Sequence, residues 1–515
     1  MKRKYGIFAA LAMTFGMIAT DAFAERLVFL TTNDTHSQID PAADNKGGIM
    51  RRKVLIDSVR EAEKNVLLLD AGDAVQGTLY FTLFKGEVEC AMLDSLRYDA
   101  YIMGNHEFDN GMEQLAKFYK NMKTVRLSAN YDLRKTPLNG LLTPYIIKEY
   151  AGRRIGIMGI NLLPKGMIAD DKCVGVVYRN AAEIADLTAE YLKKVENVDF
   201  VVMMSHVGYS GGAADNPSDN KIVAASRYID LVIGGHSHTV INPANPKSVP
   251  YKVKNADGRE IYVTQTGAQG KNVGYITLDL DKMQIGEYKL MPVDKRYDSR
   301  ADYHALKAYL APFREKVDSL MNAPLTSSVR AIDKYSSEMH NFVGDAAYDM
   351  AKELSGLKID MAIMNSGGIR QSMPKGNVSE GLIRSMFPFE NKIVVIKMTG
   401  KQLLDAFTVM AGRGGDPISN QARVTYAKLE GTRKIVKATI GGKDVDANAT
   451  YNIATIDYLA NGGDYMVSMT TCPRLYEDNE NFGDRMLDYL KKSASKGKKI
   501  NPSKETRMKR TDNGK

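Results

Sequence analysis

The chain has 515 residues, of which 44% are hydrophobic and 25% charged, and its formal net charge is +9. This length exceeds what one hydrophobic core usually serves, so we expect two domains. Most of the positive charge lies in the last 25 residues, where ten Lys or Arg face two acids, and the body from 25 to 490 is nearly neutral. The charge pattern therefore argues against a nucleic-acid polymer as partner.

The N-terminus has the pattern of an export signal, which we expect to occupy residues 1–24. Residues 2–4 are basic, residues 5–19 are mostly apolar, and residues 22–24 form an A-x-A cleavage site. The apolar run is too short to span a bilayer comfortably. We therefore expect a periplasmic or secreted protein without stable membrane insertion. The alternative is that the segment is retained as an anchor.

The three cysteines, Cys90, Cys173 and Cys472, are too few and too dispersed for a disulfide framework. In an oxidising compartment, one bridge plus one buried thiol is one arrangement. Three small apolar core residues are the other. The spacing does not decide between them.

Five short apolar runs predict buried strands, and a polar cluster follows each one. The runs are residues 27–30, 66–69, 101–103, 200–204 and 231–233, and five of the seven histidines lie in the clusters behind them. In an open α/β sheet the carboxyl ends of strands share one edge, where ligands bind. Helical stretches such as 112–120 and 181–195 alternate with the strands. The pattern predicts an α/β sandwich over residues 25–300.

The residue types in these clusters indicate a metal pair. They offer imidazole nitrogens with carboxylate and amide oxygens and no thiolate, which suits Zn, Mn or Fe better than Ca. A satisfied polar cap would explain one such cluster at a strand end. It does not explain five in succession. We therefore expect two divalent metal ions as cofactors.

A second, smaller α/β unit is predicted for residues 326–490. Residues 303–320 have apolar residues at helical spacing, so a helix within the linker 301–325 joins the two units. Strands are expected at 361–364, 393–398 and 451–456, and residues 399–402 form a capping box. Residues 491–515 are rich in Lys, Ser and Gly, which predicts a basic, disordered tail.

The motifs N-D-x-H, G-D, G-N-H-E-F-D, S-H and G-G-H-S-H, in this order, resemble those of the calcineurin-like metallophosphoesterases. With its second half included, the chain resembles the bacterial two-domain 5′-nucleotidase and UDP-sugar hydrolase family. The resemblance implies an N-terminal metallophosphoesterase α/β sandwich, a joining helix and a smaller α/β C-terminal 5′-nucleotidase domain. It also implies a nucleotide as substrate, and we expect a monomer.

The resemblance and the chemistry together assign the metal site. The implied ligands of the two ions, with Asp73 as the bridge, are Asp34, His36, Asp73, Asn105, His206, His236 and His238. His106 is set apart as a catalytic residue, because Asp109 lies three positions later and could orient its ring. The alternative for His106 is a further ligand or a packing residue.

The second unit supplies the residues that the resemblance assigns to the nucleotide. Asn365, Gly368 and Arg370 belong to an N-x-G-G-x-R motif, and the implied aromatic pair around the base is Phe389 and Tyr458. Asp464 matches the residue that holds the ribose hydroxyls. Without the resemblance, the motif is equally a polar strand-to-helix turn, and the two aromatic residues are ordinary core residues.

Two departures from the family pattern bear on phosphate and base recognition. Residues 336–340 contain no arginine where family members usually have one, and Glu390 follows Phe389 where Gly is common. The predicted function is an exported dimetal phosphohydrolase of nucleotide catabolism, acting on nucleoside 5′-monophosphates by metal-hydroxide attack. The alternatives are a 2′,3′-cyclic-nucleotide phosphodiesterase/3′-nucleotidase, a UDP-sugar hydrolase, a sulfur-ester hydrolase, or a nucleotide-binding protein without activity.

Overall fold

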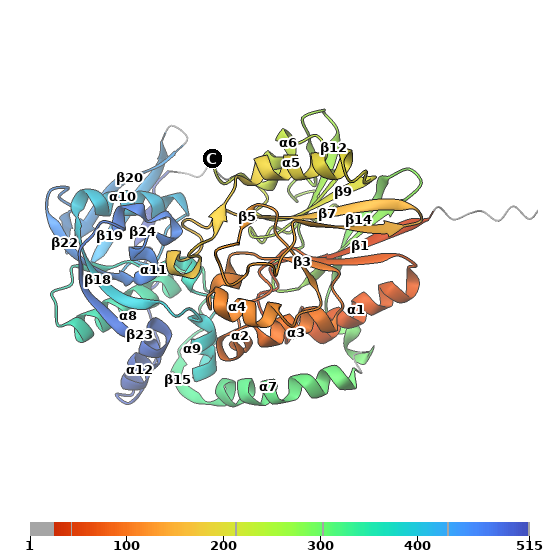
Figure 1. Cartoon of the computed structure of the whole chain (residues 1–515). Coiled ribbons are helices and arrows are strands. Elements are labelled where there is room, and N and C mark those ends of the chain that lie inside the picture. Colours follow the sequence, from red (N-terminus) through yellow and green to blue (C-terminus); the bar gives the residue numbers. More distant parts are fainter. Residues whose placement is uncertain (1–24, 43, 212–213, 301–302, 430–431, 513–515) are drawn as a thin grey trace, which may run out of the picture.

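The computed structural model describes residues 25–512 apart from 43, 212–213, 301–302 and 430–431. The predicted export signal, residues 1–24, lies outside this part of the chain. Two bodies lie side by side: an N-terminal domain, red to green in Figure 1, and a C-terminal domain, cyan to blue. Among the described residues, no helix is both long enough and apolar enough to cross a membrane.

The N-terminal domain is built on two six-stranded sheets. The first, in spatial order, contains β14 (Gln284–Pro292), β13 (Asn272–Asp279), β1 (Arg26–Thr32), β2 (Val66–Asp70), β3 (Ala100–Ile102) and β4 (Val125–Leu127). The second contains β11 (Lys252–Lys254), β12 (Glu260–Thr264), β10 (Leu231–Gly234), β9 (Phe200–His206), β7 (Arg153–Asn161) and β6 (Tyr145–Tyr150). In each sheet four neighbouring strands are parallel and antiparallel strands complete the edges.

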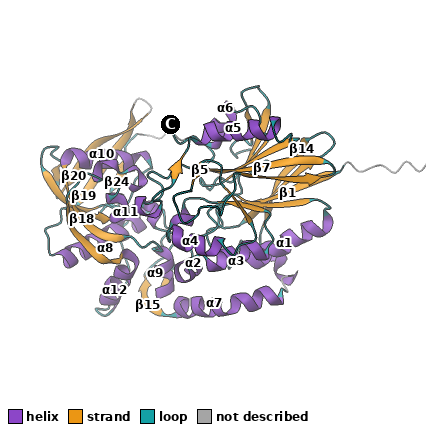
Figure 2. Cartoon of the chain, viewed as in Figure 1, coloured by secondary structure: helices purple, strands orange, loops and turns teal. Residues whose placement is uncertain are grey.

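The two sheets pack face to face, since alternate residues of their strands form one core. The rings of Phe29 and Phe200, one from each sheet, stack with centroids 6.4 Å apart. The outer face of the first sheet packs against α1 (Ile49–Ala62), α2 (Leu79–Phe84), α3 (Glu87–Ser95) and α4 (Met112–Tyr119). The second sheet is covered by α5 (Ala181–Lys194) and α6 (Asp219–Ala225). The predicted α/β sandwich is confirmed, with strands between helices as in Figure 2.

Smaller elements complete this domain, and a helix leads out of it. They are the strand pair β5 (Tyr131–Asp132) and β8 (Val177–Tyr178) and the 3-10 helices η1 (His106–Phe108), η2 (Asp170–Lys172) and η3 (Lys295–Arg300). The joining helix α7 (His304–Asn322) buries Leu306, Leu310 and Val317 in the N-terminal core. It therefore lies along the N-terminal domain before the chain enters the second one (Figure 1).

The C-terminal domain contains two four-stranded sheets and a strand pair. The first sheet contains, in spatial order, β16 (Met361–Ala362), β22 (Thr450–Ile456), β18 (Lys392–Thr399) and β23 (Arg474–Asn481). The second contains β21 (Lys443–Asp444), β20 (Thr432–Ile440), β19 (Ala422–Leu429) and β24 (Met508–Arg510). The strand pair is β15 (Pro324–Ser328) with β17 (Gly376–Ser379). The helices are α8 (Ser337–Ser355), α9 (Glu380–Met386), α10 (Gly400–Gly412), α11 (Asp457–Ala460) and α12 (Phe482–Ala494), with 3-10 helices η4 (Ser366–Gly368), η5 (Gly463–Tyr465) and η6 (Val467–Met469). The predicted capping box is present at α10, between Thr399 and Gln402.

The prediction of a disordered tail from residue 491 is wrong for the described residues up to 512. Helix α12 continues to Ala494, and β24 pairs in parallel with β19. Arg507 is buried, and its guanidinium donates to both carboxylate oxygens of Asp345, at 2.7 and 2.8 Å. The prediction from composition failed because Asp345 and strand β19 hold this segment in place.

The three cysteines are free thiols in the structure. Cys90 and Cys472 are buried and Cys173 is partly buried. Burial raises the pKa of the Cys90 thiol well above its usual range. Cys90 and Cys472 therefore behave as small apolar core residues, whereas Cys173 packs only partly buried at the edge of the core.

Candidate metal centre and interdomain cavity

The predicted metal ligands come together at the carboxyl ends of five parallel strands. Asp34 and His36 follow β1, Asp73 follows β2 and Asn105 follows β3, whereas His206 ends β9 and His236 and His238 follow β10. The first three strands belong to one sheet and the last two to the other. The cluster therefore lies where the edges of two packed sheets meet, rather than along one sheet as the sequence predicted.

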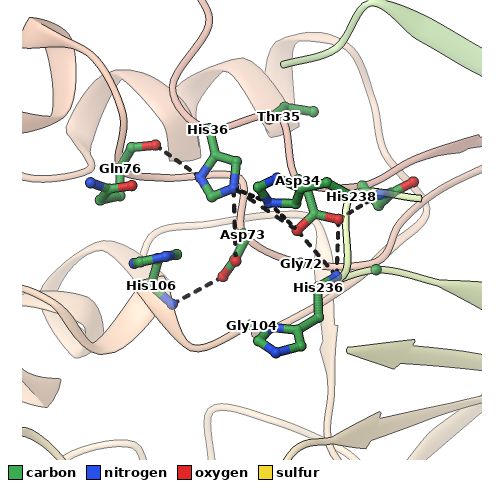
Figure 3. A network of polar contacts seen from close by, with 12 residues as sticks. Asp34, Thr35, His36, Gly72, Asp73, Gln76, Gly104, His106, His236 and His238 are labelled. Carbon is green, nitrogen blue, oxygen red and sulfur yellow. Dashed lines mark hydrogen bonds and ion pairs between the residues drawn. The ribbon is translucent and has the colours of Figure 1, made fainter. Parts of the chain in front are cut away.

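Asp34, His36, Asp73 and His238 lie close together and are joined by polar contacts (Figure 3). His206 Nε2 lies 3.1 Å from Asp73 Oδ2, and His238 Nε2 lies 3.4 Å from Asp34 Oδ1. His36 Nε2 lies 2.9 Å from His238 Nε2. Asp34, His36 and His238 form one group whose ligand atoms lie within 4.8 Å of one another, and Asp73, His206 and His236 form a second. Asn105 Oδ1 is 3.0 Å from His236 Nδ1 and so joins the second group.

This donor set fits two divalent cations. His206 Nε2 is buried without a hydrogen-bond partner, although it lies beside a carboxylate, and a cation would satisfy it. Burial lowers the pKa of His36, and it lowers the pKa of His236 to about 4, so both rings favour the neutral form that binds metal. Although burial alone would lower the pKa of His206 and raise that of Asp73, the two groups stabilise each other's charge without an ion: the pKa of His206 rises to about 10, and that of Asp73 falls well below its usual range. A cation at Asp73 would take the place of the His206 proton.

The backbone at the cluster is strained in a way that the sequence did not reveal. Five of the seven predicted ligands have positive φ: Asp34 (50°), His36 (47°), Asp73 (51°), His236 (76°) and His238 (52°). A non-glycine residue in this region costs about 1–3 kcal/mol, and such strain persists only where the surroundings enforce it. Positive φ at five of the seven predicted ligands is consistent with the predicted metal site.

Glu107 holds two of the ligand loops together, and sequence reasoning missed it. Its buried carboxylate accepts hydrogen bonds from the backbone N–H groups of Asp73 (3.2 Å), Ala74 (3.0 Å) and Gly104 (2.6 Å). Those groups belong to the loops that follow β2 and β3. A Cβ on Gly104 would come within 2.2 Å of Asp73 Oδ1, so only glycine permits this close approach. The signal in the sequence that could have identified Glu107 is its place in the G-N-H-E-F-D motif, where it is the E.

His106 and Asp109 form the pair that the sequence predicted. His106 Nδ1 lies 2.9 Å from Asp109 Oδ2, and the backbone N–H of His106 donates to Asp73 Oδ1 at 2.9 Å. Although burial alone would lower it, the carboxylates of Asp109 and Asp73 raise the pKa of His106. The ring therefore favours the protonated form beside the predicted metal ligands.

A cavity of about 640 Å³ lies between the two domains and reaches the predicted metal ligands. From the N-terminal side it is lined by Asp73, Asn105, His106, Asp109, His236 and His238, among others. From the C-terminal side its lining includes every residue predicted to bind substrate: Asn365, Gly368, Arg370, Phe389, Tyr458 and Asp464. Asp34, His36 and His206 are buried behind this surface.

The C-terminal candidates are ordered by contacts with one another and with the N-terminal domain. Arg370 places Nη2 3.5 Å from His36 Nδ1, and its guanidinium lies 5.9 Å from the centre of the Phe389 ring. The Phe389 ring lies 5.9 Å from that of His106. Asn365 donates to Asp464 Oδ2 at 2.8 Å. A potential phosphate-binding arginine and a potential base-binding ring thus both reach the histidine cluster.

Residues 336–340, where the resemblance led us to expect a further arginine, include His340, which takes part in a different hydrogen-bond network. His340 Nε2 lies 3.2 Å from Ser366 Oγ, and the Ser366 N–H and hydroxyl donate to Asp416 at 3.0 and 2.9 Å. Arg413 donates to the other Asp416 oxygen at 2.6 Å. These contacts brace the loop that carries Asn365 and Arg370.

Comparison with known proteins agrees with this geometry. The family model described as "Calcineurin-like phosphoesterase" matches residues 27–240, and "5'-nucleotidase, C-terminal domain" matches residues 317–471. The chain is 28% identical to the 5'-nucleotidase of Homo sapiens, over 97% of this chain and 94% of that protein. It is 28% identical to the 5'-nucleotidase of Vibrio cholerae, over 90% of each.

Solved structures show the same architecture. The 5'-nucleotidase precursor of Thermus thermophilus superimposes with a TM-score of 0.81 and 27% identity, over 94% of this chain and 99% of that one. Fold, site and relatives define an enzyme of the metallophosphoesterase class, a hydrolase of phosphate esters. The chain belongs to the 5'-nucleotidase family that joins a calcineurin-like phosphoesterase domain to a 5'-nucleotidase C-terminal domain.

Proposed function

We propose that the protein is an exported hydrolase that removes phosphate from nucleoside 5′-monophosphates and related nucleotides. The observation that carries this proposal is a single cavity that holds metal-ligand residues from one domain and nucleotide-binding candidates from the other. A substrate with a phosphate at one end and a base at the other matches that division. Export rests on the pattern of residues 1–24.

The proposed ligands of the two ions are the seven residues predicted from the sequence, with Asp73 as the bridge. When bound, the ions activate water as a nucleophile and neutralise charge on the phosphate. The side chains fix where this happens, because Glu107 and the strained loops leave the donor atoms little freedom. Elemental analysis of Asp73→Asn protein tests the bridge, since full retention of both ions would contradict it.

His106 is the proposed proton donor to the leaving oxygen. Asp109 accepts a hydrogen bond from Nδ1 at 2.9 Å, which orients the ring and leaves Nε2 free to face the cavity that His106 lines. A protonated imidazole there polarises the phosphate or protonates the departing nucleoside oxygen. The negative charge of Asp109 stabilises the protonated His106 ring.

Recognition in the C-terminal domain sets which ester reaches the metal site. We propose that Phe389 and Tyr458 hold the base, Asp464 the ribose, and Arg370 the phosphate through its planar fork. Asn365 orients the Asp464 carboxylate. Gly368 lets the backbone of its loop lie close to the Asn365 side chain, because a Cβ at residue 368 would come within 2.8 Å of Asn365 Oδ1. The distance from the base to the ions then decides the regiochemistry.

A substrate panel tests the function. Phosphate release is measured from AMP, UDP-glucose, a 2′,3′-cyclic nucleotide and p-nitrophenyl phosphate, with Mn²⁺ or Zn²⁺ present and Asp73→Asn protein as the control. Preference for AMP supports the proposal. Preference for the cyclic nucleotide favours the cyclic phosphodiesterase, preference for UDP-glucose favours the UDP-sugar hydrolase, and activity on none favours a binding protein. N-terminal sequencing of protein recovered from the periplasm tests cleavage after Ala24.

A further inference from the structure

The Tyr458 hydroxyl takes part in a contact that joins the two domains beside the cavity. It lies 3.1 Å from Asp464 Oδ1 and 3.3 Å from the carbonyl oxygen of Gly166. The Asp464 N–H lies 3.1 Å from the same Gly166 oxygen and 3.2 Å from the Tyr458 oxygen. Gly166 belongs to the N-terminal loop between β7 and η2, whereas Tyr458 and Asp464 lie in α11 and η5.

The hydrogen-bonding capacity of these groups fixes their roles. A phenol has one proton, and a carboxylate is a stronger acceptor than a carbonyl, so Tyr458 donates to Asp464 Oδ1. The Asp464 N–H is then shared between the Tyr458 oxygen and Gly166. Burial and the neighbouring Asp464 carboxylate raise the pKa of Tyr458 well above its usual range, so the proton stays on the phenol at neutral pH.

The Asp464 carboxylate is therefore held at both oxygens, by Tyr458 at Oδ1 and by Asn365 at Oδ2. Its backbone needs support as well, because its φ is +52°. The preceding Gly463 packs against the Tyr458 ring, where a Cβ would come within 2.5 Å of ring atoms. Stacking on a base needs only the ring, so the hydroxyl serves a separate purpose.

We propose that the Tyr458 hydroxyl is a positioning group that sets the Asp464 carboxylate for the ribose hydroxyls, while the Asp464 N–H ties the same residue to the Gly166 carbonyl of the other domain. The inference rests on the proposed nucleotide function and adds a determinant of sugar recognition to it. A ribonucleotide is then fully recognised only when the two domains are in contact. The Tyr458 hydroxyl then contributes to the discrimination between ribose and deoxyribose through the Asp464 carboxylate.

The test uses the full-length, metal-loaded protein and compares kcat/KM for AMP and 2′,3′-dideoxy-AMP. In Tyr458→Phe the preference for AMP should fall about tenfold, the usual loss for one hydrogen bond to a charged group. The change should appear mainly in KM for AMP. In an Asp464→Asn background, Tyr458→Phe should change the preference little, because both changes act on the same contact.

The matched control is Tyr489→Phe, which removes another tyrosine-to-aspartate hydrogen bond of 3.1 Å, to Asp349, in the same domain. It should keep the wild-type preference. Because the readout is a ratio of two substrates in one preparation, it does not depend on the fraction of folded protein.

Three results would overturn the inference. An unchanged preference in Tyr458→Phe, or an equal loss on both substrates, shows that the hydroxyl does not act through the ribose. A wild-type protein that hydrolyses both substrates equally shows that Asp464 does not read the sugar. If the wild type hydrolyses neither substrate in the metal-loaded form, the proposed function fails and this inference fails with it.

Discussion

Lys85 and Glu390 form an ion pair between the two domains, with 2.7 Å between Nζ and Oε1. Glu390 directly follows Phe389 and lines the cavity, at the position where the resemblance described above led us to expect glycine. Lys85 lowers the pKa of Glu390. Glu390, the residue that departs from the expected pattern, thus ties the loop that carries Phe389 to Lys85 of the N-terminal domain.

We expect Lys85→Glu to reduce kcat/KM for the nucleotide about two- to fivefold, because a partly exposed pair contributes at most about 1 kcal/mol. The double variant Lys85→Glu/Glu390→Lys should recover most of this loss at low salt. In 1 M salt the difference between single variant and wild type should shrink. Lys64→Glu, which breaks the surface pair of Lys64 with Glu25, is the control. A double variant no better than the single one would exclude the pair.

Glu107→Gln should weaken metal binding about 10- to 100-fold, the usual effect of removing a group that orients a ligand. Gln offers one acceptor oxygen where Glu107 uses both, so at least one backbone N–H of Asp73, Ala74 or Gly104 loses its partner. Calorimetric titration of metal-free protein measures this directly. Glu113→Gln, on the exposed face of α4, should bind like wild type. Unchanged affinity in Glu107→Gln would refute the role.

His106→Asn should lower kcat about 10²- to 10⁴-fold while both ions stay bound, because a positioned proton donor contributes about this much. Single-turnover kinetics and elemental analysis measure the two properties on one sample. Asp109→Asn should give a smaller loss, since the amide oxygen can still accept a hydrogen bond from Nδ1 and only the negative charge that raises the pKa of His106 is removed. Loss of metal in His106→Asn would make His106 a ligand instead, which its position near His36 and Asp73 permits.

Glu89→Gln should change how stability depends on pH. Glu89 is buried on α3 beside Ser37, and burial raises its pKa to about 7 from an ordinary 4.5. The folded state then binds the proton more tightly than the unfolded state, so stability is lost as pH rises from about 4.5 through 7, by up to about 3 kcal/mol.

Removing the charge should therefore stabilise the protein more at pH 7.5 than at pH 5. The measurement is the unfolding midpoint of Glu89→Gln relative to wild type at the two values. Glu87→Gln, exposed in the first turn of the same helix, is the control and should show little change. A difference that is the same at both pH values would show that Glu89 does not titrate in this range.

Much of the fold followed from local patterns. The strands that precede each polar cluster, the joining helix and the capping box at Thr399 could be predicted, because periodicity and end signals act over a few residues. The same locality explains the failed prediction at the C-terminus. Composition predicted disorder there, whereas Arg507 and Met508 are held by Asp345 and β19, more than 80 residues away in the chain.

The sequence by itself determined which donor atoms this protein carries and where they stand relative to its strands. Only the tertiary structure decided which atoms meet. It joined the edges of two sheets at the predicted metal ligands, gave Glu107 its three backbone partners, and paired Glu390 with Lys85 and Asp464 with Gly166. The physical reason is that these contacts join segments whose separation in space depends on sheet packing and domain arrangement, about which local residue patterns carry no information.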